Sequence, residues 1–531
     1  MNFENYNINK SDVPYLAALT IFSMILVIYY IIFNLKLGIY CTDVYIYLGN
    51  SLTFSGVDIK YPGTIYLAPV ICFLTSLLFR IGIQGEIAIF IITGIFAIIG
   101  NIGFYILLKT RFNKYLSITG AIVYSCLSLN LMWLANGTLD IPAVAITIWV
   151  VIYTILAINK DPKYYPIAVG LFLVGFLIRF TEGFILPILF VYFVYKTRFK
   201  LEAKAKKYLY GSLIACVVIF LITVLVLFIV SPRNLYFLEI IYNATQGSKG
   251  ARNNPAYTLD TWFYLKHFLE FISSSYCQFN GRVPSLKNPT PLAYGVIGLL
   301  IVGAVLSINK LKQITIKNKK LIIPTVILAI FIMATFTHII GLVSIVLTLL
   351  VILMTYYLLK DSGFKHLELN FLFLTWILVY FMYFTYFNTK VDRYIITLMP
   401  AFIYFVIAAV DVIEVKIKIK KVIPIILIAL FIVNAFGFAF TISEHENFHN
   451  YKEITDILKE MDYDLKNKTV GSSFIRACLW YLQQPITPLL DNNLTAIENS
   501  NLTYYIDSKN LTLENYEIFI EHNGIYVYIH K

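Results

Sequence analysis

The sequence predicts an all-α polytopic membrane protein that ends in a small α/β domain. Hydrophobic residues make up 59% of the 531-residue chain and charged residues only 14%, against about 25% charged residues in soluble proteins. Apolar segments recur over residues 15–441, whereas the remaining C-terminal part is polar. A soluble fold could not bury this much apolar surface, so we expect the bilayer to cover it.

Thirteen apolar segments are each close to the roughly 20 residues that a helix needs to cross the hydrocarbon core. They lie near residues 15–36, 86–108, 116–134, 141–159, 164–181, 183–195, 208–230, 291–308, 321–337, 339–359, 370–387, 394–413 and 422–441. No small-residue cleavage site follows the first segment, so we expect a retained signal anchor rather than a removed signal peptide.

A further apolar piece, residues 64–79, decides the topology because it is short and follows a Tyr-Pro-Gly sequence. If it crossed the membrane, the basic loop clusters would fall outside. If it lies in the interface, all of them fall on the cytoplasmic side, where Lys and Arg are retained. The clusters are residues 109–114, 160–163, 196–207, 309–320, 360–365 and 416–421. We therefore predict a multi-pass cell-membrane protein with a cytoplasmic N-terminus and an extracytoplasmic C-terminus.

Four segments then lie outside the membrane. They are a long first loop with Asp43 and Asp58, a short turn that ends at Asp140, a loop over residues 231–290, and the polar tail. The tail has an amphipathic helix pattern over residues 451–465 and strand-like segments after it. The predicted domains are therefore a transmembrane domain, residues 1–442, which would hold the site, and a small extracytoplasmic α/β domain, residues 443–531.

Ionisable residues gather at the outer ends of the predicted spans. They are Asp43, Asp140, Arg179, Glu182, Lys390, Asp392 and Arg393. Ionisable groups at membrane depth are costly and usually mark a functional site. The middle of the predicted bundle has no comparable set, although a transporter would need polar groups there. The pattern therefore indicates chemistry on one face of the membrane.

A carboxylate beside several cations suits transfer of a group from an anionic donor. The carboxylate can take a proton from an acceptor hydroxyl or amine, and the cations can stabilise the charge on the leaving group. If the leaving group is a phosphate, no general acid is needed. The set predicts sugar transfer from a lipid phosphate, with Asp43 as the base.

Structural interpretations of the same residues stay open. Asp43 could be an ordinary charged residue of a loop. Asp140 could cap a helix N-terminus. Arg179 and Glu182 are three residues apart and could neutralise each other on one helix face, and Arg393 could pair with Asp392.

Four segments resemble glycosyltransferase family 39 of the GT-C superfamily. They are "TDVYIYLGNSLTFSG" with "YPGTIYLAPVICFLTSLLFRIG", then "NGTLDIPAVAITIWVVIY", "VGFLIRFTEGFILPILF" and "KVDRYIITLMPAFIYFVIAA". Their order and sidedness match over nearly the whole chain. The similarity includes the spans and the outer C-terminal domain of the lipid A aminoarabinose transferases and protein mannosyltransferases.

The resemblance implies a GT-C-like membrane glycosyltransferase, a hexosyl or pentosyl transferase that uses a polyprenyl- or dolichyl-phosphate sugar and inverts C1. Asp43 would match the catalytic base and Asp140 the second outer-loop acid. The acceptor would be a protein or a glycolipid. The chain departs from the family pattern at Val44, where many members have a second acid next to the base.

The resemblance also implies a set of residues that bind the donor phosphate. Arg393 and Tyr394 would match the family's Arg-Tyr pair, and Lys390 is close enough in sequence to help. Arg179 stands where many members have a lysine, and a guanidinium can bind a phosphate through two hydrogen bonds.

Three other functions stay open: a transporter or flippase of lipid-linked saccharides, a receptor-like protein whose tail binds a partner, and a metal-dependent oligosaccharyltransferase-like enzyme. Asp43 and Asp140 could contribute to a divalent metal site, but no acid pair stands beside either of them, so we expect no cofactor. Nucleic acid is not an expected partner, because the net charge of +12 is distributed over loops next to the bilayer. The six cysteines form no metal-binding or disulfide pattern.

Overall fold

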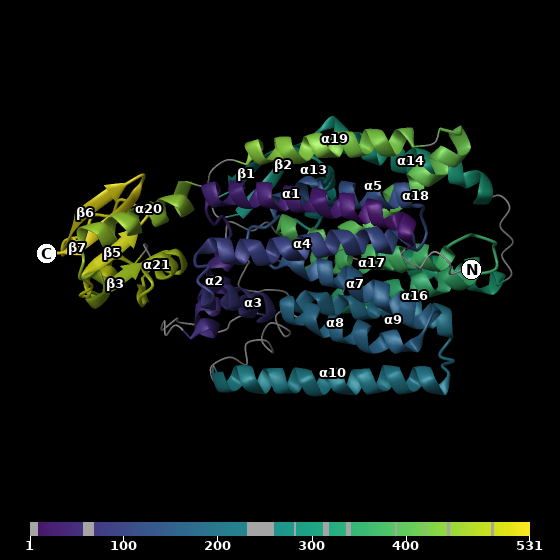
Figure 1. Cartoon of the computed structure of the whole chain (residues 1–531), viewed down its shortest axis with the longest axis horizontal. Helices are drawn as coiled ribbons and strands as arrows, with labels where there is room; N and C mark the ends of the chain where they lie inside the picture. Colours follow the sequence, from purple (N-terminus) through teal and green to yellow (C-terminus); the bar gives the residue numbers. More distant parts are fainter. Residues whose placement is uncertain are drawn as a thin grey trace.

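The computed structural model describes residues 9–56, 68–230, 260–280, 283–311, 318–335, 341–387, 390–419, 421–442, 446–489 and 493–531. Helices that run side by side form an elongated bundle, and a small α/β unit lies at one end of it (Figure 1). Asp58 and residues 231–259 of the predicted outer loop lie outside the described residues.

The helices before the long loop are α1 (Val13–Leu37), α2 (Thr42–Ser55), α3 (Val70–Arg80), α4 (Glu86–Lys109), α5 (Lys114–Ser125), α6 (Ser128–Met132), α7 (Asp140–Asn159), α8 (Tyr165–Ile178), α9 (Ile185–Thr197) and α10 (Ala203–Val230). Those after it are α12 (Phe263–Lys266), α13 (Phe268–Ile272), α14 (Pro291–Leu311), α15 (Ile322–Thr335), α16 (Gly341–Leu359), α17 (Leu367–Tyr386), α18 (Met399–Ile417) and α19 (Val422–Phe438). Short 3-10 turns lead into several of them. Two of these turns bear on the site: η4 (Phe180–Phe184) precedes α9, and η7 (Asp392–Leu398) precedes α18.

Nine helices in the described part of the chain are long and apolar enough to cross a membrane. They correspond to nine of the predicted spans, and α8, α14, α15 and the pair α5–α6 correspond to the other four. One prediction was wrong in detail. Residues 116–134 are not a continuous helix, because α5 ends at Ser125 and the chain turns into the short α6.

The apolar piece that decided the topology forms a short helix. In its described part, α3 has 11 residues, which is about 17 Å of helix, whereas the hydrocarbon core is about 30 Å thick. It packs beside α2 at the end of the bundle (Figure 1). A helix of this length agrees with the predicted interfacial position.

The basic clusters described in the structure lie at the same end of the bundle as the N-terminus. Lys109 Nζ is 3.1 Å from a carboxylate oxygen of Asp12, and the Lys421 ammonium lies over the ring of Tyr115. The α/β unit, α2 and α3 lie at the opposite end (Figure 1). This separation agrees with the predicted topology, while the assignment of the basic end to the cytoplasm still rests on the positive-inside rule.

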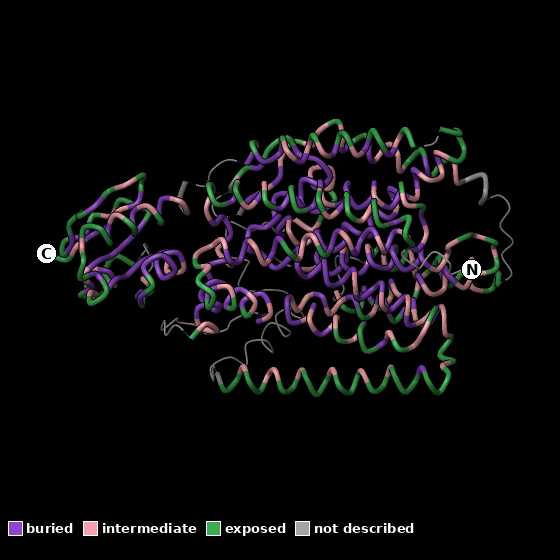
Figure 2. The backbone as a smooth tube through the Cα atoms, in the orientation of Figure 1, coloured by how far each residue is buried: buried purple, intermediate pink, exposed green. Residues whose placement is uncertain are grey.

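Burial separates central helices from peripheral ones (Figure 2). In α7 and in the η7–α18 segment, 78% of the residues in the apolar 18-residue stretch are buried, whereas in α10 only 6% are. The exposed side chains of α10 are almost all apolar, which suits a helix that faces lipid. The central helices of the bundle are therefore α7 and α18. Both begin at the end of the bundle where the site residues were predicted.

A β-hairpin, which the all-α prediction for the membrane part did not include, lies at this end. Strands β1 (Ser274–Asn280) and β2 (Val283–Pro289) pair antiparallel. The Leu286 amide of β2 donates a 2.9 Å hydrogen bond to the buried Asp392 carboxylate, so the hairpin fixes the start of η7.

The α/β unit has a five-stranded sheet in the order β4-β3-β5-β7-β6. Its strands are β3 (Val470–Ser472), β4 (Ile486–Pro488), β5 (Tyr504–Asp507), β6 (Tyr516–His522) and β7 (Ile525–His530), and its helices are α20 (Glu446–Met461), α21 (Ile475–Leu482) and α22 (Leu494–Glu498). Strand β3 pairs parallel with β4 and β5, and the other pairs are antiparallel. Helix α21 packs on α2 and joins the unit to the bundle.

Candidate active site

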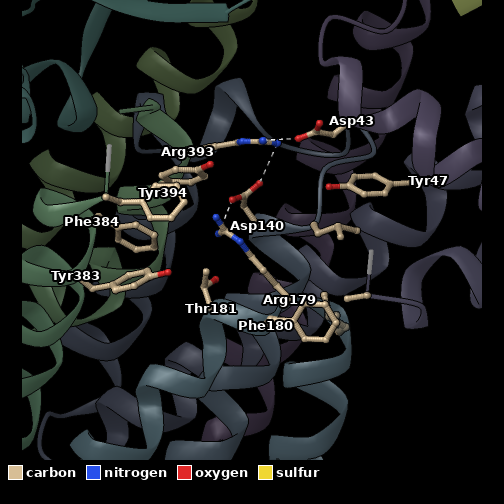
Figure 3. A pocket seen from close by; sticks show the side chains of 14 residues that line it. Asp43, Tyr47, Asp140, Arg179, Phe180, Thr181, Tyr383, Phe384, Arg393 and Tyr394 are labelled. Atoms are coloured by element: carbon tan, nitrogen blue, oxygen red, sulfur yellow. Dashed lines mark hydrogen bonds and ion pairs between the residues drawn. The ribbon is translucent and has the colours of Figure 1, made fainter. Parts of the chain in front are cut away.

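A cavity of about 340 Å³ lies next to α2, at the end of the bundle that bears the α/β unit. Its size is at the lower end of the roughly 300–1,000 Å³ of small-molecule sites. It is lined by Asp43, Tyr47, Ala68, Leu139, Asp140, Ile178, Arg179, Phe180, Thr181, Tyr383, Phe384, Phe387, Arg393 and Tyr394 (Figure 3). All the residues predicted for the site lie here except Lys390.

Asp43 enters the cavity from the first turn of α2. The Tyr40 hydroxyl just before this helix donates a hydrogen bond to the Met132 carbonyl, which ties the start of α2 to the loop before α7. One oxygen of the Asp43 carboxylate lies 2.5 Å from Nη2 of Arg393 (Figure 3). The side chain is 29% exposed, so a molecule that enters the cavity can reach it.

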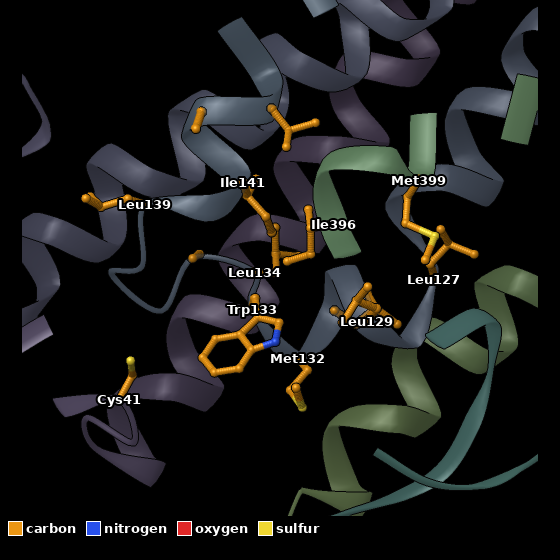
Figure 4. Close-up of a cluster of buried hydrophobic side chains, with 14 of the residues drawn as sticks. Cys41, Leu127, Leu129, Met132, Trp133, Leu134, Leu139, Ile141, Ile396 and Met399 are labelled. Carbon is orange, nitrogen blue, oxygen red and sulfur yellow. The ribbon is translucent and has the colours of Figure 1, made fainter. Parts of the chain in front are cut away.

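Asp140 opens α7 at the end of a buried loop. Gly137 in this loop has φ +89°, and a Cβ there would lie 2.7 Å from Val44 Cγ1 on α2, so the turn requires glycine. Trp133 and Leu134 of the same loop lie in a buried apolar cluster (Figure 4). The loop is thus fixed against α2 and the core, and it sets the position of Asp140.

The Asp140 carboxylate pairs with arginine. Its Oδ1 is 2.5 Å from Nη1 of Arg179, and its side chain is only 3% exposed. Asp140 lies in the first turn of α7, directly after Leu139 at the N-cap position, where a carboxylate interacts favourably with the helix dipole. Unlike Asp43, this carboxylate is sealed from an incoming acceptor.

Arg179 reaches the cavity because the helix breaks in front of it. Helix α8 ends at Ile178, and residue 179 has extended backbone, with φ −154°, before the chain turns into η4. Its guanidinium lies 5.1 Å from the centre of the Tyr394 ring, a distance at which a cation is attracted to an aromatic face.

Arg393 connects the two carboxylates. While Nη2 pairs with Asp43, its Nη1 lies 3.8 Å from Oδ2 of Asp140. The guanidinium also lies within 6 Å of the ring centres of Trp133 and Tyr394. The two arginines and two acids therefore form one network, with the Tyr394 ring next to both cations (Figure 3).

The two ion pairs considered from the sequence, Arg179 with Glu182 and Arg393 with Asp392, are not formed. Glu182 instead accepts hydrogen bonds from the Thr147 hydroxyl, at 2.6 Å, and from the Tyr380 hydroxyl, at 3.2 Å. Asp392 accepts its bond from the Leu286 amide. Both interpretations were wrong, because each acid faces a different neighbour from the adjacent arginine.

Lys390 lies apart from the cavity lining. Its buried ammonium donates to the carbonyls of Phe384, at 3.0 Å, Thr385, at 2.6 Å, and Phe387. These carbonyls belong to the C-terminal end of α17 and the residue after it, where helical partners are missing. Burial lowers the pKa of Lys390 to about 8. The structure thus places this lysine as a cap of α17.

Two polar atoms of the cavity have capacity for a ligand. Arg393 Nε and Thr181 Oγ1 are buried and have no hydrogen-bond partner among the described residues. Buried polar groups are nearly always satisfied, so oxygen atoms of a bound anion fit this place. Burial would raise the pKa of Asp43, but the Arg393 guanidinium outweighs it and holds the pKa below its usual value. The Asp43 carboxylate is therefore ionised at neutral pH.

The comparisons with known proteins point to one superfamily. Residues 67–227 match the family model described as dolichyl-phosphate-mannose-protein mannosyltransferase. The crystal structure of ArnT from Cupriavidus metallidurans bound to undecaprenyl phosphate superposes with a TM-score of 0.60 at 10% identity, over 97% of this chain and 98% of that one. The family model and the shared fold are both those of GT-C membrane glycosyltransferases. The archaeal oligosaccharyltransferase AglB from Archaeoglobus fulgidus, in complex with an inhibitory peptide and a dolichol-phosphate, is also similar, with a TM-score of 0.52, 10% identity, and coverage of 92% of this chain and 69% of that one. No curated protein sequence matches the chain.

Several residues around this cavity were not predicted from the sequence. Tyr47 and Thr181 line the cavity, but a tyrosine or threonine in an apolar helix gives no signal by itself. Arg476 of α21 lies 3.8 Å from the free oxygen of Asp43. Arg476 lies more than 80 positions along the sequence from every predicted site residue, in a part of the chain predicted as a separate domain.

The cavity offers few metal ligands. Among the described residues, no group of three or more His, Cys, Asp or Glu side chains is arranged to hold a metal ion. Asp43 and Asp140 each face an arginine, and a cation between them would be repelled by these neighbours.

Proposed function

We propose that this protein is an inverting glycosyltransferase that moves a sugar from a polyprenyl- or dolichyl-phosphate donor to a protein or glycolipid acceptor. The observation that supports it most is the convergence of Arg179, Arg393, Asp43 and Asp140 in one cavity at the end of a membrane bundle. The solved ArnT and AglB structures contain undecaprenyl phosphate and dolichol-phosphate respectively, which is consistent with a lipid-phosphate donor here.

In this proposal the donor phosphate binds to the two arginines. Their guanidiniums can each form up to five N–H donor contacts, and only some are used by the carboxylates. Thr181 Oγ1, which has no partner among the described residues, adds a hydroxyl donor. The lipid chain would leave the cavity toward the apolar bilayer.

The reaction is a single displacement at C1 of the sugar. The acceptor oxygen or nitrogen attacks C1 while Asp43 takes its proton, and the bond from C1 to the phosphate oxygen breaks. The electron pair leaves with the lipid phosphate, whose charge the two arginines stabilise. One displacement inverts C1. Asp43 suits the role of base because it is ionised and reachable, whereas Asp140 is sealed and holds Arg179.

The site would work on the extracytoplasmic face, with the N-terminus in the cytoplasm. The N-terminus and the described basic clusters share one end of the bundle, and the cavity and the α/β unit share the other. Retention of Lys and Arg on the cytoplasmic side then assigns the cavity to the outside.

Mass spectrometry of the purified protein with a panel of polyprenyl-phosphate sugars and a mixture of peptide and glycolipid acceptors tests this function. We expect the wild type to convert at least one donor to free lipid phosphate, and Asp43→Asn to leave it intact. Asp456→Asn, which alters an exposed acid on α20, serves as the matched control. A donor that binds but keeps its mass in the wild type would contradict the proposal and favour a flippase.

A further inference from the structure

The α/β unit is docked on α2, which lines the cavity, and on the neighbouring α3 and α4. The hydroxyls of Tyr45 on α2 and Tyr481 on α21 are 3.2 Å apart. Trp480 stacks on Phe79 of α3, with ring centres 6.2 Å apart, and its indole N–H donates a 3.3 Å hydrogen bond to Glu86 of α4. Three helices of the bundle therefore set the position of α21, and so of its side chains.

One of these side chains faces the proposed base. Arg476 Nη1 lies 3.8 Å from Oδ1 of Asp43, while Arg393 Nη2 holds Oδ2 at 2.5 Å. The Asp43 carboxylate thus has one cation from the bundle and one from the α/β unit. The Arg476 side chain is 42% exposed and makes no hydrogen bond with a described residue, so it has room to approach Asp43.

Donor binding would change which anion Arg393 pairs with. A phosphate that binds to Arg393 competes with Asp43 for the same guanidinium. Arg179 pairs with Asp140 rather than with Asp43, and the two arginines that the structure describes within 4 Å of Asp43 are Arg393 and Arg476. Arg476 is the remaining cation next to the base.

We propose that Arg476 is a positioning residue for the base: when the donor phosphate occupies Arg393, Arg476 holds the Asp43 carboxylate in its ionised form and in its orientation. This inference rests on the proposed function and extends it, because it makes the α/β unit part of the reaction. The C-terminal unit would then be required for the chemical step as well as for folding.

The groups around Asp43 determine the sign of the expected effect. They are Arg393 of η7, Arg476 of α21, Arg179 after α8, Asp140 of α7, and two residues close to Asp43 in sequence, Cys41 and Tyr47. Burial raises the pKa of Asp43, and the arginines lower it further than burial raises it. Loss of Arg476 therefore raises the pKa of Asp43. For two charges about 4 Å apart in water-like surroundings the shift is about 0.5–1 pH unit.

The test is the pH profile of kcat in Arg476→Gln and Arg476→Lys, with the donor that the wild type consumes from the panel. We expect the acid limb of Arg476→Gln to move up by about 0.5–1 pH unit, because kcat reports the donor-bound enzyme. Arg476→Lys should restore the wild-type profile. Arg80→Gln, which removes an exposed arginine of the nearby α3, is the matched control and should not shift it. An equal loss of kcat at every pH in Arg476→Gln would indicate a structural role and overturn the proposal.

A titration without turnover separates this inference from the proposed function. The Asp43 carboxyl carbon, labelled with ¹³C and assigned with Asp43→Asn, is titrated with undecaprenyl phosphate present in wild type and in Arg476→Gln. A higher pKa in the variant supports the inference, and superimposed curves overturn it. A higher pKa together with no conversion of any donor would contradict the proposed function, and with it the role of Arg476 in catalysis.

Discussion

Replacement of Asp140 by asparagine tests how the buried network is balanced. The Asp140 carboxylate is 3% exposed and lies 2.5 Å from Arg179 and 3.8 Å from Arg393. Asparagine keeps the shape but leaves buried arginine charge without a partner, which costs about 3–5 kcal/mol. With about 2.1 cal/mol/K of unfolding entropy per residue, a chain of 531 residues changes its midpoint by about 1 °C per kcal/mol. We expect Asp140→Asn to unfold about 3–5 °C below the wild type.

A lipid phosphate should restore this loss in part. Its charge replaces that of Asp140 beside the arginines, so undecaprenyl phosphate should raise the melting temperature of Asp140→Asn more than that of the wild type. The assay is a thermal unfolding curve in detergent with and without the lipid, with Asp456→Asn as the control. A variant that melts with the wild type, or that gains less from the lipid, would refute the idea that Asp140 balances a phosphate clamp.

Three further changes test other parts of the site. Arg393→Ala should weaken binding of undecaprenyl phosphate about 10- to 150-fold, the equivalent of a charged hydrogen bond of about 1.5–3 kcal/mol; unchanged binding by calorimetry would remove Arg393 from the clamp. Lys390→Met should cost about 1–3 kcal/mol of stability by leaving the carbonyls at the end of α17 unpaired, with lipid affinity retained; weakened affinity at unchanged stability would place Lys390 in the donor site. EDTA should leave sugar transfer unchanged, and loss of activity that Mg²⁺ or Mn²⁺ restores would show that a metal is needed.

Much of the fold could be predicted because the membrane imposes a simple pattern. The apolar segments predicted the helices, the basic loops predicted which loops lie at one end of the bundle, and the short α3 follows from the length of its apolar run. The break after Ser125 was missed, because the segment stays apolar on both sides of it. The hairpin β1–β2 was also missed, although Asn280-Gly281 between two short segments is a common hairpin signal.

The candidate site was predictable in its members but only partly in its pairings. The outer-end position of Asp43, Asp140, Arg179 and Arg393 brought them to one end, and the structure joins them in one cavity. The ion pairs considered from closeness in sequence were wrong. Arg179 does not pair with Glu182, because the helix break after α8 turns the arginine away from it. Arg476 could not be predicted, since its distance from Asp43 depends on how the α/β unit docks on α2.

The central claim is that Asp43 acts as the base in sugar transfer, and single-turnover kinetics tests it most directly. Donor is bound in advance to wild type and to Asp43→Asn, acceptor is added, and lipid phosphate is followed by mass spectrometry. Loss of a general base usually lowers the rate about 10²- to 10⁴-fold, so we predict a decrease of this size with the donor still bound to the variant. A rate within a few-fold of the wild type would contradict the account.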